Sequence, residues 1–455
     1  MARDGAVYAC QSCGAVHSKW SGRCTACGAW NSLAEEITAQ PPGALAPSRL
    51  SRSAQIVFEG LEAESPTPAR TVTGVDEFDR VCGGGVVPGS AILIGGDPGV
   101  GKSTLLLQVC ASASLGGARC AYVSGEEAVE QIRARAQRLG LGAAPVKLAT
   151  ETSLREIVAG LKREAFDLVA IDSIQTLWSD GHEAGPGSVT QVRACVGELV
   201  RLAKRRNIAV VLVGHVTKDG QIAGPRVVEH MVDAVLSFEG ERGYPFRILR
   251  AAKNRFGATD EIGVFEMGDA GLAEVKNPSS LFLSDGGLRS PGAAVFAGIE
   301  GSRPVLVEIQ ALVAPSAYGT PRRAVVGWDN GRLAMVLAVL EARCGLGFGA
   351  HDVYLNVAGG LRISEPAADL AAAAALASSV LETALPQGLV VFGEISLSGE
   401  VRPVNRMEAR LKEASKLGFS RALIPKAPES GSGVATTCVS RLADAIGRIG
   451  DERWD

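Results

Sequence analysis

The sequence lacks any apolar run that approaches the roughly 20 residues needed to cross a membrane. Its first residues, MARDGAVYAC, hold no apolar stretch of signal-peptide length. We therefore expect a cytoplasmic protein in which thiols stay reduced, so that the 10 cysteines serve as ligands or core residues and not as disulfides. A strong charge is also missing, since the formal net charge is −3. This argues against a broadly basic protein that coats nucleic acid, but not against DNA held by loops inside a ring.

A chain of 455 residues is too long for one ordinary core, because a domain spans roughly 100 to 200 residues. With 46% hydrophobic and 21% charged residues, the composition is that of a soluble globular protein. We predict four parts: a zinc ribbon over 1–34, a linker rich in Ala, Pro, Ser and Glu over 35–65, an ATPase domain over 66–285 and a further domain over 286–455.

Near the start of the chain, two Cys-x-x-Cys pairs are separated by ten residues, and each is followed by a glycine. Together they complete a closed tetrahedral site, so we predict structural Zn²⁺; a redox pair would need a βα context that is missing. The predicted ligands are Cys10, Cys13, Cys24 and Cys27. We expect Tyr8, Trp20 and Trp30 to pack over the site. His17 is a fifth candidate ligand, but with four cysteines so placed we expect it to be a surface residue.

The strongest motif is a phosphate-binding loop, GDPGVGKS over 96–103, between an apolar strand pattern at 91–94 and a helical pattern at 104–113. Its glycines let backbone amides wrap the phosphates of ATP at a helix N-terminus, while Lys102 adds charge and Ser103 ligates Mg²⁺. The predicted nucleotide-binding residues are Gly96, Asp97, Pro98, Gly99, Val100, Gly101, Lys102, Ser103, Thr104 and His215.

Further apolar runs at the spacing of βα units predict an α/β fold with a mainly parallel, doubly wound sheet. These runs are 120–123, 168–171, 208–213, 234–238 and 246–249. Asp172 ends one run, at the strand tip where a second magnesium ligand belongs. Glu126 follows another and is the candidate that orients water, with Glu127 as the alternative; either could instead be a helix-start carboxylate. His215 ends a third and is a candidate γ-phosphate sensor.

Several segments form a combined pattern: Thr73–Asp79, Gly83–Gly85, the phosphate loop, Tyr122–Glu127 and the pentapeptide Lys253–Gly257, KNRFG. Together they resemble the RadA (Sms) family of bacterial DNA repair proteins. The resemblance covers essentially the whole chain. It implies a RecA-like motor that assembles as a homo-hexameric ring on single-stranded DNA and extends recombination intermediates made by the RecA recombinase.

Lys253 and Arg255 follow a strand pair, at an edge position from which both cations could reach a neighbouring subunit's nucleotide. A solvated basic turn is the alternative. We expect DNA at two glycine-rich loops, 179–189 and 218–228, where Lys218 and Arg226 add charge; they could equally be simple connections.

The last part has strand patterns at 305–309 and 353–357 and an alanine-rich helix at 367–385. Its segment Gly393–Val404, GEISLSGEVRPV, resembles a strand segment of the Lon proteolytic domain, which implies an α+β fold. That family uses a Ser–Lys pair, but the two positions hold Ala367 and Glu408. We therefore expect no peptidase activity and a scaffold or DNA surface instead. Three arginines at four-residue spacing predict one helical face, either solvated or on DNA. They are Arg402, Arg406 and Arg410.

The favoured function is a DNA-dependent ATPase that drives branch migration. A nucleotide-gated binding module that hydrolyses little is the second possibility, and an ATP-dependent protease is the third.

Overall fold

The computed structural model of the 455-residue chain divides into two compact units. The first unit is Met1–Gly240 with Arg247–Glu274, and the second is Glu241–Phe246 with Val275–Asp455. The structure describes residues 6–10, 15–30, 32–37, 69–216, 222–223, 226–240, 245–259, 261–283, 290–316, 320–425 and 433–450. Within these ranges, no helix has both the length and the apolar character that crossing a membrane requires.

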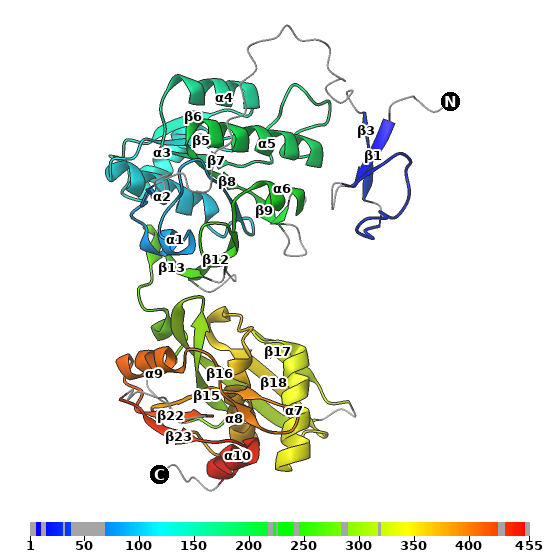
Figure 1. The fold of residues 1–455 in the computed structure, drawn as a ribbon, viewed down its shortest axis with the longest axis vertical. Helices are drawn as coiled ribbons and strands as arrows, with labels where there is room; N and C mark the ends of the chain where they lie inside the picture. Colours follow the sequence, from blue (N-terminus) through cyan, green and yellow to red (C-terminus); the bar gives the residue numbers. More distant parts are fainter. Residues whose placement is uncertain are drawn as a thin grey trace, which may run out of the picture. The chain divides into compact units, whose positions relative to one another are not determined.

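A small antiparallel sheet in the order β2-β1-β3 begins the first unit (Figure 1). Its strands are β1 (Ala6–Cys10), β2 (Val16–His17) and β3 (Leu33–Ile37). Cys10, Cys24 and Leu33 are buried, and Tyr8 packs against them as expected. Our placement of the two tryptophans over the site is wrong, because 58% of Trp20 and 72% of Trp30 are exposed. Most of the predicted linker lies outside the described residues.

The predicted ATPase part is built on a nine-stranded sheet, ordered β14-β13-β12-β11-β4-β8-β7-β5-β6. All five ladders from β11 to β6 are parallel, which confirms the predicted parallel centre. The strands are β4 (Ala91–Gly95), β5 (Cys120–Ser124), β6 (Lys147–Thr150), β7 (Leu168–Asp172), β8 (Ala209–Val213), β11 (Ala234–Glu239), β12 (Phe246–Asn254), β13 (Ile262–Gly268) and β14 (Gly271–Glu274). β9 (His215–Val216) and β10 (Ile222–Ala223) form a separate ribbon.

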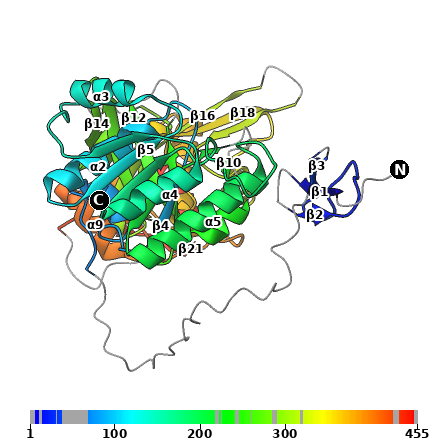
Figure 2. The ribbon, with the colours of Figure 1, turned by 90° about the horizontal axis from the view of Figure 1, so that it is seen from above.

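Helices cover both faces of this sheet (Figures 1 and 2). On one face, α1 (Asp76–Val81), α2 (Lys102–Leu115) and α3 (Val129–Arg138) contribute to one apolar core. On the other face, α4 (Leu154–Arg163), α5 (Val189–Arg206) and α6 (Arg226–Met231) contribute to a second. Every residue of β4, β5, β7 and β8 is buried as a result, which explains their continuous apolar runs.

One side of the sheet is antiparallel: β11 pairs with β12, and β13 pairs with β14. Lys253 belongs to β12, which lies between β11 and β13 in the sheet. The edge position that we expected for Lys253 is therefore wrong, because two further strands continue the sheet beyond it.

The second unit holds a seven-stranded mixed sheet, ordered β17-β18-β16-β15-β19-β22-β23, and a short hairpin. The strands are β15 (Ala293–Glu300), β16 (Arg303–Pro315), β17 (Arg323–Val326), β18 (His351–Val357), β19 (Leu389–Val391), β20 (Glu394–Ile395), β21 (Val401–Arg402), β22 (Arg421–Ile424) and β23 (Ala435–Cys438). The short 3₁₀ turns are η1 (Pro278–Leu281), η2 (Ala358–Gly360) and η3 (Pro366–Ala368).

The helices of this unit are α7 (Asn330–Cys344), α8 (Asp369–Val380), α9 (Met407–Lys416) and α10 (Leu442–Gly450). The alanine-rich α8 is buried on nearly all sides, with α7, α10 and the sheet around it. Small side chains allow this close packing, and a helix that is apolar all round belongs in a core. It ends at Val380, five residues before the predicted end.

Candidate nucleotide site

The phosphate loop connects buried β4 to α2, which begins at Lys102. Glycine is required at Gly96, because a Cβ there would lie 2.3 Å from the carbonyl oxygen of Phe238. Gly99 and Gly101 have φ of 82° and 113°, a region that side chains disfavour. A Cβ on Gly99 would meet no atom within 4 Å, so this part of the loop faces open space. The loop has the backbone shape and the room that the phosphates of ATP require.

Lys102 is 5% exposed and lies over the loop. Its Nζ donates to the carbonyl oxygens of Gly96 (2.6 Å) and Asp97 (2.9 Å). Burial lowers the pKa of this amine, and the nearby carboxylates of Asp172, Asp97 and Glu126 partly offset the shift. The site therefore holds a desolvated cation that anionic phosphates would stabilise.

Asp172 ends β7 and is 4% exposed. The hydroxyl of Tyr122 on β5 donates to its Oδ2. Burial, and then the charge of Asp172, raise the pKa of Tyr122 well above its ordinary value, so the phenol remains a donor. This buried hydrogen bond fixes the carboxylate at the carboxyl end of the strand.

Glu126 and Glu127 have different partners. The hydroxyl of Ser173, next to Asp172, donates to the carboxylate of Glu126. Glu127 instead forms an ion pair with Arg135 of α3. The Ser124 hydroxyl accepts the backbone N–H groups of both glutamates, at 3.2 and 2.9 Å. The structure thus places Glu126 beside Asp172 and directs Glu127 toward α3.

Of the other predicted nucleotide-site residues, Ser103 lies in the first turn of α2 and is partly buried. His215 begins β9, and its backbone pairs with Ala223 of β10; its side chain lies outside the described residues.

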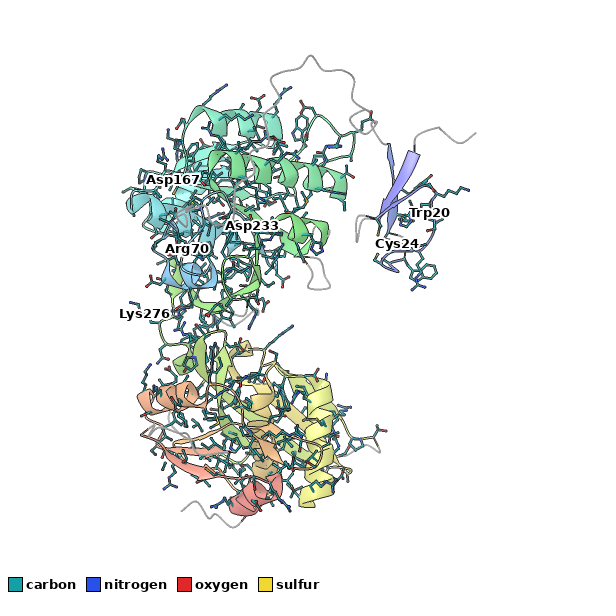
Figure 3. All side chains as sticks on the ribbon, in the orientation of Figure 1. Trp20, Cys24, Arg70, Asp167, Asp233 and Lys276 are labelled. Carbon is teal, nitrogen blue, oxygen red and sulfur yellow. The ribbon has the colours of Figure 1, made fainter. Side chains whose placement is uncertain are left out.

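The KNRFG segment is held by contacts inside its own subunit. Lys253 Nζ donates to the carbonyl oxygens of Glu229 and Val232, each at 2.7 Å, at the end of α6. Arg255 pairs with Asp233 (3.0 Å), whose other oxygen accepts the N–H of Ala91 at 3.1 Å. Asp233, labelled in Figure 3, therefore joins Arg255 to the first residue of the strand that leads to the phosphate loop. The Arg255 side chain is still 54% exposed.

Two arginines that the sequence analysis did not single out hold the KNRFG segment and the phosphate loop through hydrogen bonds to the backbone. Arg70 donates to the carbonyl oxygens of Cys82 (3.0 Å) and Phe256 (2.5 Å), which ties the KNRFG segment to the Gly83–Gly85 turn. Arg247 of β12 donates to Val100 O of the phosphate loop (3.1 Å). Neither residue lies in a motif, so only the packing reveals them.

The first predicted DNA loop is more ordered than its composition indicated. Gln191 of α5 is 2% exposed, and its amide contacts the backbone of Ser179, His182 and Ala184 through hydrogen bonds of 2.8 to 3.1 Å. This part of the chain holds no lysine or arginine. Lys218 lies outside the described residues, and so does the side chain of Arg226 in α6.

The predicted zinc ligands come together: sulfur atoms of Cys10, Cys24 and Cys27 lie within 4.8 Å of one another, while Cys13 is outside the described residues. The pKa of Cys24 is lowered to about 5, chiefly by the backbone N–H of Cys27. Our assignment of His17 to the free surface needs correction, because it is half-buried and its Nε2 lies 3.4 Å from Cys24 Sγ.

The remaining cysteines divide into two groups. Most are buried, as expected, but Cys438 is exposed and Cys344 is only partly buried. Our expectation that every cysteine is a ligand or a core residue is therefore wrong for these two.

In the second unit, Ala367 is buried in η3 and Glu408 is exposed in the first turn of α9. The predicted basic helical face is wrong. Arg402 lies in β21, and Arg406 precedes α9 with φ of 57°. Arg410 is 2% exposed, pairs with Glu365 (2.6 Å) and stacks on Phe392. Two of these arginines lie outside the helix, and the third is in the core.

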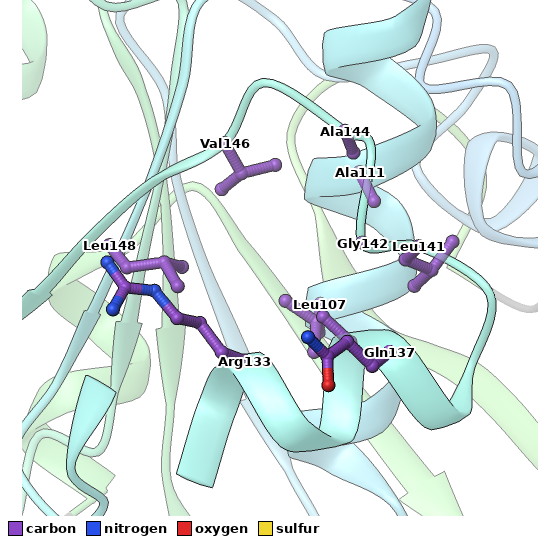
Figure 4. A pocket seen from close by; sticks show the side chains of 10 residues that line it. Leu107, Ala111, Arg133, Gln137, Leu141, Gly142, Ala144, Val146 and Leu148 are labelled. Carbon is purple, nitrogen blue, oxygen red and sulfur yellow. The ribbon is translucent and has the colours of Figure 1, made fainter. Parts of the chain in front are cut away.

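A cavity of about 220 Å³ lies between α2, α3 and the segment leading to β6 (Figure 4). Leu107, Leu141 and Leu148 give it a mostly apolar lining, with Arg133 and Gln137 among its lining residues. None of the predicted nucleotide-site residues lines it. A groove of about 440 Å³ between α4 and α5 reaches Ser179 of the first predicted DNA loop.

Three protein-family models match parts of the chain. Residues 62–221 match an AAA domain, residues 8–35 a rubredoxin metal binding domain, and residues 318–428 subunit ChlI of Mg-chelatase. Two solved structures are also similar. One is an isolated ATPase domain, and the match covers 48% of this chain and 95% of that domain, with 13% identity and a TM-score of 0.40. The other is the RadB recombinase, where the match covers 45% and 100%, with 22% identity and a TM-score of 0.37.

Relatives named DNA repair protein RadA match nearly the whole chain. The protein from Brucella abortus is 62% identical, covering 99% of this chain and 98% of the relative. Those from Bacillus subtilis and Pseudomonas aeruginosa are 47% and 49% identical, each covering 98% of this chain and 99% of the relative. The chain belongs to the RadA family. The predicted family and fold class are thereby confirmed, with an α/β P-loop core on a mainly parallel sheet, a zinc ribbon and a second mixed domain. The relatives are named DNA repair proteins and residues 62–221 match an AAA domain, which together support a DNA repair ATPase, the coarse part of the predicted function and activity.

Proposed function

We propose that this RadA protein couples ATP hydrolysis to movement on single-stranded DNA. One observation carries the proposal: Lys102, Asp172 and Glu126 lie close together at the carboxyl ends of β4, β7 and β5 of one sheet. Loop amides and Lys102 would bind the phosphates, and Ser103 with Asp172 would hold Mg²⁺, which supplies charge neutralisation when it is bound. Glu126 would orient the attacking water.

Arg255 is the residue that we propose to act on a neighbouring subunit's nucleotide, with Lys253 beside it. The exposed part of the Arg255 side chain supports this role. Asp233 links Arg255 to Ala91, the first residue of the strand that leads to the phosphate loop of the same subunit. Such a contact stabilises charge in the transition state and raises the rate of hydrolysis by on the order of 10³-fold or more. It requires a neighbouring subunit, and we propose that a homo-hexameric ring supplies it.

The DNA contacts that we propose are made by the loops 179–189 and 218–228, where backbone amides and the cations Lys218 and Arg226 would bind phosphates without reading bases. The first loop carries no cation of its own, so the second would supply the salt-sensitive part of binding. His215 opens the ribbon that leads into this second loop, which supports its role as a γ-phosphate sensor.

Membership of the RadA family supports a place in recombinational repair. We propose that the ring promotes branch migration of intermediates made by the RecA recombinase, with RecA and branched DNA as partners. The cysteine cluster supports Zn²⁺ in the ribbon, with Cys13 as the fourth ligand. The domain limits that we propose are 1–34, 35–65, 66–285 and 286–455, with a scaffold role for the last domain.

A nucleotide-gated binding module is the competing function. Wild-type protein and Arg255→Ala are compared for ATP hydrolysis with and without single-stranded DNA, at low and high salt. Arg138→Ala, an exposed arginine on α3, is the matched control. Stimulation by DNA that weakens with salt and disappears only in Arg255→Ala supports the motor. Hydrolysis that is absent, or independent of DNA, favours the module.

A further inference from the structure

Five exposed cations gather where α4 and α5 end, and we call them the basic end patch. They are Lys162, Arg163, Lys204, Arg205 and Arg206. The two helices lie side by side (Figures 1 and 2). Arg206 fixes their ends together, because its Nη2 lies 3.4 Å from the carbonyl oxygens of both Lys162 and Glu164. The patch is therefore one surface built by two helix ends.

The basic end patch keeps its charge. Among the described residues, no carboxylate oxygen lies within 4.0 Å of a side-chain nitrogen of these five residues. The nearby acids are neutralised by other cations: Glu164 pairs with Lys147, Asp167 with Arg119, and Glu198 with Arg201. A chain with a formal net charge of −3 thus concentrates unpaired positive charge at one place.

The patch is separate from the nucleotide site. Of its five residues, Lys162 also lines the groove that reaches Ser179 of the first proposed DNA loop. α4 leads into β7 and α5 leads into β8, so the patch lies at the amino ends of these strands. Asp172 ends a parallel strand, and Lys102 and the first loop follow the carboxyl ends of two parallel strands, at the opposite edge of the sheet. A ligand at the basic end patch would leave the nucleotide site free.

Complementing the helix dipoles is the simplest explanation for cations in a last turn. The dipole acts only within the last turn, so one or two cations there are enough to complement it. Lys204, Arg205 and Arg206 are consecutive, and successive residues point about 100° apart around a helix. They spread charge over the exposed end of α5 more widely than the dipole requires.

We infer that the basic end patch binds the phosphate backbone of duplex DNA, as a second DNA surface beyond the proposed loop contacts. Arginine matches phosphate geometry, and lysine adds point charge. Sites for single-stranded DNA often add aromatic side chains on which bases stack. In the described part of α4, α5 and the residues that follow each helix, no large aromatic is exposed. Contacts to phosphates alone suit a duplex, whose bases are already stacked.

The test is duplex binding by the full-length triple variant Arg163→Gln/Lys204→Gln/Arg205→Gln. Arg206 is kept because it joins the helices. The matched control, Arg133→Gln/Arg138→Gln/Lys412→Gln, makes the same charge change at exposed residues elsewhere. Affinity for a labelled duplex of about 20 base pairs is measured by fluorescence anisotropy over a salt series. Because each phosphate contact contributes about −0.9 to the slope of log K against log salt, we expect the slope to flatten by about 2 to 3.

We also expect the patch variant to lose at least about tenfold in duplex affinity near 0.1 M salt, while the control changes little. Unfolding temperature and hydrolysis stimulated by single-stranded DNA should stay at wild-type values, which separates this inference from the proposed loop contacts. Equal affinity and slope in wild type and patch variant would overturn it, as would an equal loss in the control. Loss of poly-glutamate binding with unchanged duplex binding would assign the patch to an acidic protein and overturn it too.

Discussion

Glu126 and Glu127 are neighbours in the sequence, yet their side chains have different tasks in the fold. Because Glu126 lies beside Asp172 through Ser173, Glu126→Gln should keep ATP binding and lower the turnover number by at least about 100-fold. The amide has nearly the same shape but cannot accept a proton. Nucleotide affinity by fluorescence titration and steady-state hydrolysis measure the two effects.

Glu127→Gln is the matched control at the adjacent position. It weakens the partly buried ion pair with Arg135, so a loss of about 1 kcal/mol in the free energy of unfolding is expected, with turnover close to wild type. The reverse result, in which Glu127→Gln stops hydrolysis and Glu126→Gln does not, would move the water-orienting role to Glu127.

Among the elements, α9 shows how spacing in a sequence can mislead. Arg410 is buried with Glu365, so Arg410→Ala leaves an uncompensated carboxylate and should lower the free energy of unfolding by about 3 to 5 kcal/mol. Arg402→Ala removes an arginine that is 56% exposed and should change it by less than about 0.5 kcal/mol. Chemical denaturation of the full chain measures both, and similar losses in the two variants would contradict the buried pair.

The zinc ribbon is the element whose folding depends on its metal. Cys27→Ser replaces one thiolate of the cluster, and a structural zinc site contributes about 10 to 16 kcal/mol. We expect bound zinc to fall from about one ion per chain to nearly none, while ATP hydrolysis without DNA is unchanged. Atomic absorption gives the zinc content. Cys438→Ser changes an exposed cysteine outside the cluster and should keep its zinc; retention of zinc by Cys27→Ser would exclude this site.

The sequence predicted well those elements whose pattern lies within one short, contiguous stretch of residues. Buried parallel strands give continuous apolar runs, and the phosphate loop and the cysteine pairs are short, contiguous motifs. The errors concern residues whose role depends on distant partners. The prediction of one helical face from Arg402, Arg406 and Arg410 is wrong because α9 begins only at Met407. The prediction of an edge position for Lys253 is wrong because β13 and β14 extend the sheet beyond β12.

At the scale of the whole molecule, the proposed active site is shared between subunits. Lys102 and Glu126 would serve the nucleotide of their own subunit, whereas Arg255 would serve that of a neighbour. Nothing in a single chain's sequence or fold displays such a division, because the partner surface belongs to another copy. Mixing variants can reveal it.

Lys102→Ala and Arg255→Ala should each be inactive in DNA-stimulated hydrolysis when assayed alone. In rings formed from an equal mixture, about one interface in four joins an intact phosphate loop from an Arg255→Ala subunit to an intact Arg255 from a Lys102→Ala subunit. Activity should therefore return to about a quarter of the wild-type rate. A mixture of Lys102→Ala with Glu126→Gln should recover nothing, because no subunit holds both residues of one site. No recovery in the first mixture would show that Arg255 acts within its own subunit through Asp233. Recovery in the control would show that Lys102 and Glu126 do not have to belong to the same subunit.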